Sequence, residues 1–131
     1  TFHNIFAHPC WLYEPDDAAK RYSVTVTLQG NQINVTHNWQ LTPLREAFLA
    51  SKGDLYWKPL LAVLKAKGWL PDDWQRIIRL ALFCCPTLVM DLRAGAAAQH
   101  NPVSSAIGLS VAMMLGSEGD DDFTEWLNSL I

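Results

Sequence analysis

A short polar segment near position 100 carries the side chains whose types and spacing could do chemistry. It holds a cation, an imidazole and an amide, and it runs into two serines that would begin a helix. The unpaired N–H groups and the positive dipole end of a helix N-terminus attract anions. The segment therefore predicts a binding site for a phosphate or carboxylate, formed by Arg93, His100, Asn101, Ser104 and Ser105.

The same residues also have an ordinary structural interpretation. Serines commonly cap helices, and Asn101-Pro102 favours a turn. The sequence has no phosphate-binding loop with its lysine. Ordinary capping is the favoured interpretation, and the anion site is the alternative to it.

His37 is a further candidate, because it falls on an apolar face between Val35 and Trp39. In a core, such a histidine would form a hydrogen bond with a backbone group. In a pocket lined by aromatic side chains, loss of solvent would lower its pKa. The core interpretation is favoured, but His37 joins the candidate ligand-binding residues.

The possible metal ligands do not form a recognised site. His3, His8 and Cys10 are suitable ligand types for zinc, and His37 could complete the set, but their spacing matches no known motif. The acidic run at residues 118–122 lacks the alternating ligands of a calcium loop. We therefore expect no metal and no cofactor.

The charge and the cysteines limit the class of protein. The net charge is −3 and the basic residues are scattered, which argues against nucleic acid as a partner. Three cysteines, two of them adjacent at Cys84 and Cys85, do not form a disulfide framework. The expected location is therefore the cytoplasm, a reducing compartment.

The most apolar stretch does not predict a membrane span. Residues 80–92 are shorter than the roughly 20 apolar residues that a bilayer requires, and they include Pro86 and Asp91. No membrane partner is expected. From Leu80 to Met90 the stretch is apolar nearly all round, which predicts a helix buried on all sides.

The clearest local pattern is a hairpin. Residues 22–28 and 33–39 alternate between apolar and polar side chains on either side of Gly30-Asn31. Glycine at the first loop position favours a type II′ turn. The apolar face is expected to pack on helices or to extend a larger sheet. The predicted pairs are Leu28 with Ile33, Val26 with Val35, Val24 with His37, and Tyr22 with Trp39.

Helices are expected along the rest of the chain. Thr42-Pro43 is typical of a helix start, Gly53 is expected to end that helix, and Pro86 is expected to kink or split the central one. Residues 1–13 could instead form an edge strand. The expected helices are 43–52, 55–67, 72–84 with a shorter piece after it, 106–115 and a terminal amphipathic helix from Phe123 to Ile131.

The predicted fold class is α+β. An N-terminal antiparallel hairpin, alone or in a small sheet, precedes five or six helices around a central buried helix. The 131 residues fit a single domain, which could be a fragment or the C-terminal domain of a longer chain.

Two functions follow from these patterns. The first is an intracellular protein-interaction or regulatory module, because six tryptophans and an acidic loop beside an amphipathic helix suit an interface. Its partner would be another protein or a parent chain, and a homo-oligomer stays open. The alternative is an enzyme or ligand-binding domain that uses the anion site around Arg93, His100 and Ser104, with His37 or His100 as acid or base.

Overall fold

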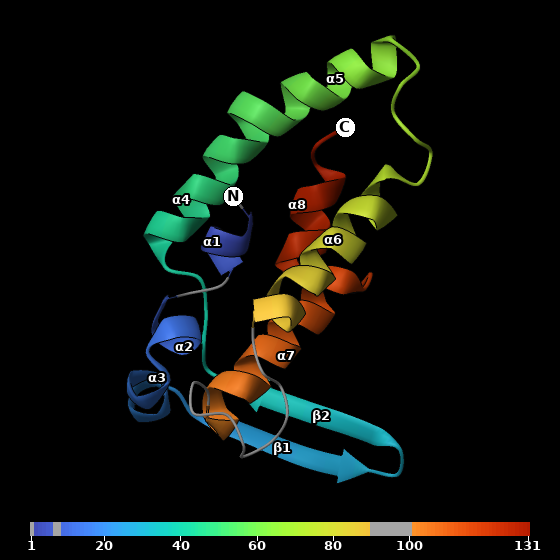
Figure 1. Ribbon diagram of the computed structural model, residues 1–131. Helices are drawn as coiled ribbons and strands as arrows, with labels where there is room; N and C mark the ends of the chain where they lie inside the picture. Colours follow the sequence, from blue (N-terminus) through green and yellow to red (C-terminus); the bar gives the residue numbers. More distant parts are fainter. Residues whose placement is uncertain (1, 7–8, 90–100) are drawn as a thin grey trace.

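The computed structural model describes residues 2–6, 9–89 and 101–131, and it confirms the α+β class (Figure 1). Short helices precede a two-stranded antiparallel hairpin, and longer helices follow it. In chain order the elements are α1 (Phe2–Phe6), α2 (Pro9–Tyr13), α3 (Pro15–Arg21), β1 (Val24–Gln29), β2 (Gln32–His37), α4 (Pro43–Lys52), the π-helix η1 (Gly53–Trp57), α5 (Lys58–Ala66), α6 (Trp74–Val89), α7 (Pro102–Gly116) and α8 (Asp122–Asn128).

The edge strand expected at residues 1–13 is wrong, because α1 and α2 occupy this part of the chain. Ile5 and Phe6 are both buried, and so are Trp11 and Leu12. In a strand, neighbouring side chains point to opposite faces, whereas adjacent residues on a short helix can both face a core. The paired burial therefore suits helices.

The hairpin has the predicted register over the length of its strands. Leu28 pairs with Ile33, Val26 with Val35, and Val24 with His37. The predicted Tyr22–Trp39 pair lies beyond the strand ends, because the ladder begins at Val24 and His37. Gly30 has a φ of +60° and no other residue in the described turn has a positive φ, as a type II′ turn requires.

α7 is the most deeply buried helix of the described fold. Its sequence is apolar around the whole circumference, and buried side chains follow every turn from Ile107 to Leu115. α6 lies along it, and the two come so close at Gly116 that a Cβ there would be 2.8 Å from the Cβ of Phe83. The central buried helix is therefore α7.

The stretch expected to be buried on all sides, Leu80 to Met90, begins within α6, and that expectation is wrong. Leu80 is 52% exposed and Cys84 is exposed as well, because only one side of α6 packs on α7. An apolar helix surface can be buried on all sides, but the number of neighbouring helices that cover it determines how much of that surface is buried.

The helix is also not split at its proline. α6 begins at Trp74 and continues through Pro86 to Val89 as one helix. Pro86 removes one backbone donor, and the neighbouring Thr87 hydroxyl donates to the carbonyl oxygens of Phe83 (3.2 Å) and Cys84 (2.9 Å). These side-chain bonds do not replace the backbone bond that the proline removes, because their acceptors lie one and two residues beyond Leu82.

α4 ends at Lys52 with Gly53 as its C-cap, as predicted. The backbone of Gly53 is nevertheless helical (φ −57°, ψ −56°), so α4, η1 and α5 continue as one long arm (Figure 1). A Cβ at Gly53 would be 3.0 Å from Nε1 of Trp126 and 3.5 Å from Leu130. The glycine therefore allows the C-terminal segment to approach the arm. Gly68, with a φ of +67°, lies in the turn that follows α5.

A buried arginine joins the last three helices. Arg79 of α6 donates to the carbonyl oxygens of Leu115 and Ser117 at the end of α7, and its Nη2 donates to Thr124 Oγ1 of α8 at 2.9 Å. The arginine thus satisfies carbonyl groups that the end of a helix leaves unpaired. α8 buries Phe123 and Leu127 against this unit, whereas Ile131, expected on the same stripe, is exposed.

Candidate functional site

The start of α7 uses two of the predicted anion-site residues as a cap. The Asn101 side chain accepts from the backbone N–H of Ser104 at 3.0 Å, and the Ser104 hydroxyl accepts from the backbone N–H of Asn101 at 3.1 Å. Ser104 is fully buried and Ser105 is half-buried. This reciprocal pair is a capping box, with Asn101 rather than a serine at the cap position.

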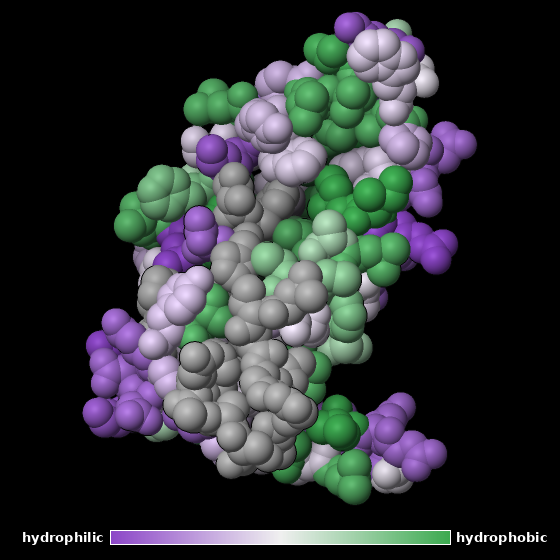
Figure 2. Space-filling model, in the orientation of Figure 1, coloured by the Kyte–Doolittle hydropathy of each residue, from purple (hydrophilic) through white to green (hydrophobic). Residues whose placement is uncertain are grey.

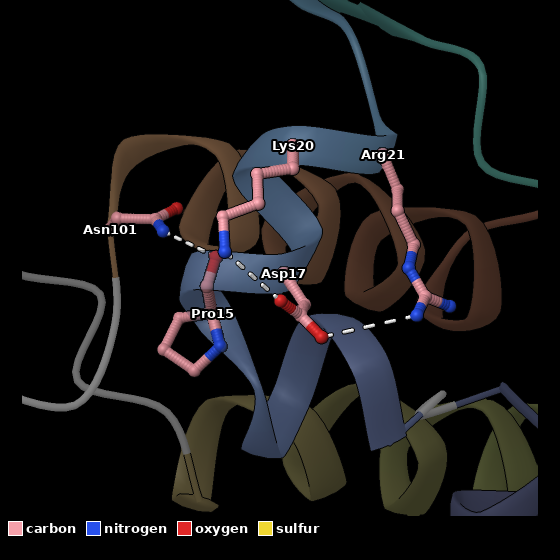
Figure 3. Close-up of polar contacts among 5 residues, drawn as sticks. All are labelled: Pro15, Asp17, Lys20, Arg21 and Asn101. Carbon is pink, nitrogen blue, oxygen red and sulfur yellow. Dashed lines mark hydrogen bonds and ion pairs between the residues drawn. The ribbon is translucent and has the colours of Figure 1, made fainter.

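Asn101 also attaches α7 to α3. Its side-chain amide donates to the carbonyl oxygen of Pro15, as Figure 3 shows. On the same short helix Asp17 pairs with Lys20 (3.3 Å) and Arg21 (3.9 Å) at the surface. The polar atoms of the Asn101 side chain are therefore engaged in structural hydrogen bonds.

Arg93 and His100 lie outside the described residues, so the anion site around them stays a prediction. His37, the remaining candidate, is the last residue of β2 and contacts α7 at a different place. It faces Ser110, six residues beyond Ser104, which corresponds to about 9 Å along a helix axis. His37 and the described members of the polar segment therefore act at separate places.

His37 fixes the base of the hairpin to α7. Its Nε2 lies 3.1 Å from the Ser110 hydroxyl, and its ring meets Trp39 edge-on with 6.3 Å between ring centroids. Burial lowers the pKa of His37, while the backbone groups of Trp39 and of His37 itself partly oppose this shift. The imidazole is therefore held in its neutral form at neutral pH.

A cavity of about 450 Å³ opens beside His37, between α4, α7, α8 and the segment after the hairpin. Aromatic side chains form much of its wall, and Ser110 and His37 lie at one side of it. Trp39 and Trp126 come from segments far apart in the chain, and Trp126 stacks on Phe123 with ring centroids 5.9 Å apart.

The charged residues of this cavity are acidic. Glu46 of α4 and Asp122 of α8 contribute carboxylates, and the described lining includes no lysine or arginine. Arg45 is next to Glu46 in the chain, but its guanidinium donates to the carbonyl oxygens of Asn4 and Ile5. The cavity therefore differs in charge from the anion site predicted near position 100.

The second notable surface is the end of the hairpin. We define the hairpin tip face as Val26, Leu28 and Ile33, which are 57%, 73% and 62% exposed. The register places all three on the face that Val24 and His37 turn toward α7. Figure 2 shows hydrophobic surface on this hairpin where it projects from the rest of the molecule. The apolar face expected to be packed is thus covered only at its base.

The tryptophans mainly build the core. Trp11 and Trp39 are buried and meet edge-on with 6.1 Å between ring centroids. Trp69 is exposed in the turn after α5, where the Lys67 ammonium lies 4.5 Å from the ring centroid. The high tryptophan content is therefore mostly explained by packing.

No metal site or membrane span is found in the parts of the chain that the structure describes. No three His, Cys, Asp or Glu side chains among residues 2–6, 9–89 and 101–131 come together as a metal site would need. Within the same residues, no helix is long and apolar enough to cross a membrane. Comparison with protein-family models, curated proteins and solved structures found no match to this chain.

Sequence reasoning missed the cavity and the exposure of the hairpin tip. Glu46, Ser110 and Asp122 lie on three separate helices, and no local pattern links them to His37. The alternation in the hairpin correctly predicted a shared apolar face. The lack of charge in residues 23–37 was the available signal that this face is unusual, because exposed strands commonly carry charged residues.

Proposed function

We propose that this protein is a protein-interaction module, and that its partner packs an apolar surface against the hairpin tip face. The observation that supports this proposal is the exposure of Val26, Leu28 and Ile33 on a hairpin that projects from the helices. Single exposed apolar residues are common on proteins, but three adjacent ones at a projecting edge are typical of an interface.

The backbone of the hairpin supports the same role. Within the described residues β1 pairs only with β2, so each strand has one edge without a neighbouring strand. Natural edge strands are commonly protected by lysine, proline or a bulge. Residues 23–37 include no Asp, Glu, Lys, Arg or Pro. Both the tip face and the strand edges are therefore suitable for contact with another chain.

The energetic gain from covering this face is large enough to matter. Burying an exposed Val, Leu or Ile side chain contributes about 1.5–3 kcal/mol. Because the three side chains are 57–73% exposed, burying what is left of them would supply roughly 3–6 kcal/mol before the entropic cost of association is subtracted. Because the hairpin is uncharged, this binding should depend little on ionic strength.

We place the module in the cytoplasm, where reduced cysteines are stable. Cys84 is an exposed free thiol in α6, and burial raises the pKa of the Cys85 thiol, which keeps that group protonated. A second copy of this chain is one candidate partner, because the tip face is self-complementary in its apolar character.

A matched pair of variants tests the proposal. Leu28→Thr with Ile33→Thr removes apolar surface from the tip face and places threonine, a β-branched residue with high strand propensity, at both positions. Thr27→Ala with Asn34→Ala changes the opposite, polar face of the neighbouring pair and serves as the control. Tagged wild type and both variants would be compared by quantitative affinity capture from the native host and by light scattering.

The proposal expects one protein, or a dimer of this chain, to be retained by the wild type and the control and lost from the tip variant. Retention should be the same at low and at high salt. Equal recovery by all three proteins would contradict the assignment of the tip face. If the wild type is a monomer and retains no protein, the proposal that this chain is a protein-interaction module would be contradicted.

A further inference from the structure

We propose that the cavity beside His37 binds a small aromatic amine that also carries a hydroxyl group. This site is separate from the hairpin tip face and does not depend on a protein partner. At about 450 Å³ the cavity falls within the range of small-molecule sites, roughly 300–1,000 Å³.

The walls favour an aromatic ligand body. Phe6, Trp39, Phe123 and Trp126 line the cavity together with aliphatic side chains such as Leu49. Aromatic rings stack or meet edge-on with a gain of about 0.5–1.5 kcal/mol beyond the burial of their area. A planar apolar ligand would therefore match more of this wall than a sugar or a phosphate would.

The charged residues of the lining favour a ligand with a positive charge. Glu46 of α4 and Asp122 of α8 both line the cavity, so two acidic residues from separate helices border one space. No lysine or arginine is among the described lining residues, so the charge of the described lining disfavours an anion. An ammonium group would be attracted by both carboxylates and by the faces of the tryptophans.

A buried donor favours a second polar group on the ligand. Trp39 lines the cavity and is only 6% exposed, yet its indole Nε1 makes no hydrogen bond. A buried donor without a partner costs about 1–3 kcal/mol, and a ligand oxygen that accepts from it would recover that cost. The Ser110 hydroxyl and His37 imidazole lie at the same wall and can bond to a hydroxyl group as well.

Tyramine is a suitable probe, because it combines an ammonium group, an aromatic ring and a hydroxyl group. Phenethylamine lacks the hydroxyl group, and hydroxyphenylpropionate replaces the ammonium group with a carboxylate. Tryptophans in the cavity wall allow intrinsic fluorescence to report binding, and calorimetry would confirm the stoichiometry. We expect saturable binding of tyramine at one site, weaker binding of phenethylamine and no binding of hydroxyphenylpropionate.

Three variants locate the site. Glu46→Gln with Asp122→Asn should weaken tyramine binding by at least about tenfold, because the attraction for the ammonium group is lost. Glu118→Gln removes an exposed carboxylate outside the lining and should leave binding unchanged. Ala50→Phe adds bulk at the cavity wall without altering charge and should abolish binding.

All variants would be checked for an unchanged thermal transition, so that loss of binding is not loss of folding. Equal affinity for tyramine and hydroxyphenylpropionate would overturn the proposal, as would absence of saturable binding by both amines. The proposal would also be overturned if tyramine still bound both to the Glu46→Gln, Asp122→Asn variant and to Ala50→Phe, because the ligand would then occupy another place.

Discussion

The two ends of the hairpin carry the same kind of face and meet different surroundings. At the base, Val24 and His37 are half-buried against α7, and His37 contacts Ser110. At the tip, Leu28 and Ile33 continue the same face but are mostly exposed. Alternation thus determines which side chains share a face, whereas the position of α7 determines how far along the strands that face is covered.

The base and the tip of the hairpin are expected to have different roles, one in stability and the other in binding. Residues at the base and in α7 should contribute to folding, and residues of the tip face should contribute to contact with a partner. Variants of the two regions can therefore strengthen or contradict this division.

The largest effect on stability is expected from Trp39→Ala, just beyond the base of the hairpin. Trp39 is buried, meets Trp11 and His37 edge-on, and forms part of the cavity wall. Its removal should lower the free energy of unfolding by about 3–5 kcal/mol. Chemical denaturation followed by circular dichroism would measure this. A loss below about 1 kcal/mol would mean that the base is not part of the core.

Gly116→Ala should have the next largest effect, because it disturbs α7, on which the base rests. The added Cβ would lie 2.8 Å from the Cβ of Phe83, so α6 and α7 would have to move apart. We expect a loss of about 1–3 kcal/mol, as for other cases of overpacking. Thermal unfolding would detect it. An unchanged or higher melting temperature would contradict the close approach of the two helices.

A smaller effect is expected from the titration of His37 at the base. Burial lowers its pKa below the ordinary value of 6.5, so the unfolded chain binds this proton more readily than the folded chain. The stability that neutral His37 contributes is complete above about pH 6.5 and is lost as the pH falls toward the lower pKa of the folded state.

His37→Gln removes this titration while keeping a side chain that can hydrogen-bond. The free energy of unfolding of wild type minus that of the variant should decrease between about pH 8 and pH 5. Denaturation curves at several pH values would give this difference, and the subtraction cancels the other histidines. A difference that stays constant or increases on acidification would contradict the burial of His37.

The smallest effect on stability is expected at the tip face. Val26→Thr, Leu28→Thr and Ile33→Thr should each change the free energy of unfolding by less than about 0.5 kcal/mol, since these side chains are mostly exposed. The same denaturation experiment provides the measurement. Losses as large as that of Trp39→Ala would show that the tip face is part of the core.

Much of the local structure could be predicted because its causes lie close together in the chain. The Gly30 turn and the alternation around it determine the hairpin register. Thr42 and Pro43 determine the start of α4, where the Thr42 hydroxyl accepts from the backbone N–H of Arg45. In these cases the residues that decide the structure are within a few positions of one another.

Features that depend on distant segments were not predictable in the same way. Gly53 ends α4 as the sequence predicts, but no local pattern shows that η1 continues the helical path there or that the Trp126 side chain approaches it. α6 and α7 are both rich in apolar residues, and only the packing of the other helices distinguishes them. The cavity could not be predicted from any local pattern, because its lining residues Glu46 and Asp122 come from opposite parts of the chain.

The most direct test of the central claim is site-specific photo-crosslinking from the hairpin in the native host. A photoreactive phenylalanine analogue would replace Leu28 on the tip face in one protein and Asn34 on the opposite face in another. We predict that the probe at Leu28 forms a crosslink to one protein, or to a second copy of this chain, and that the probe at Asn34 does not. Equal crosslinking from both positions, or none from Leu28, would contradict the account.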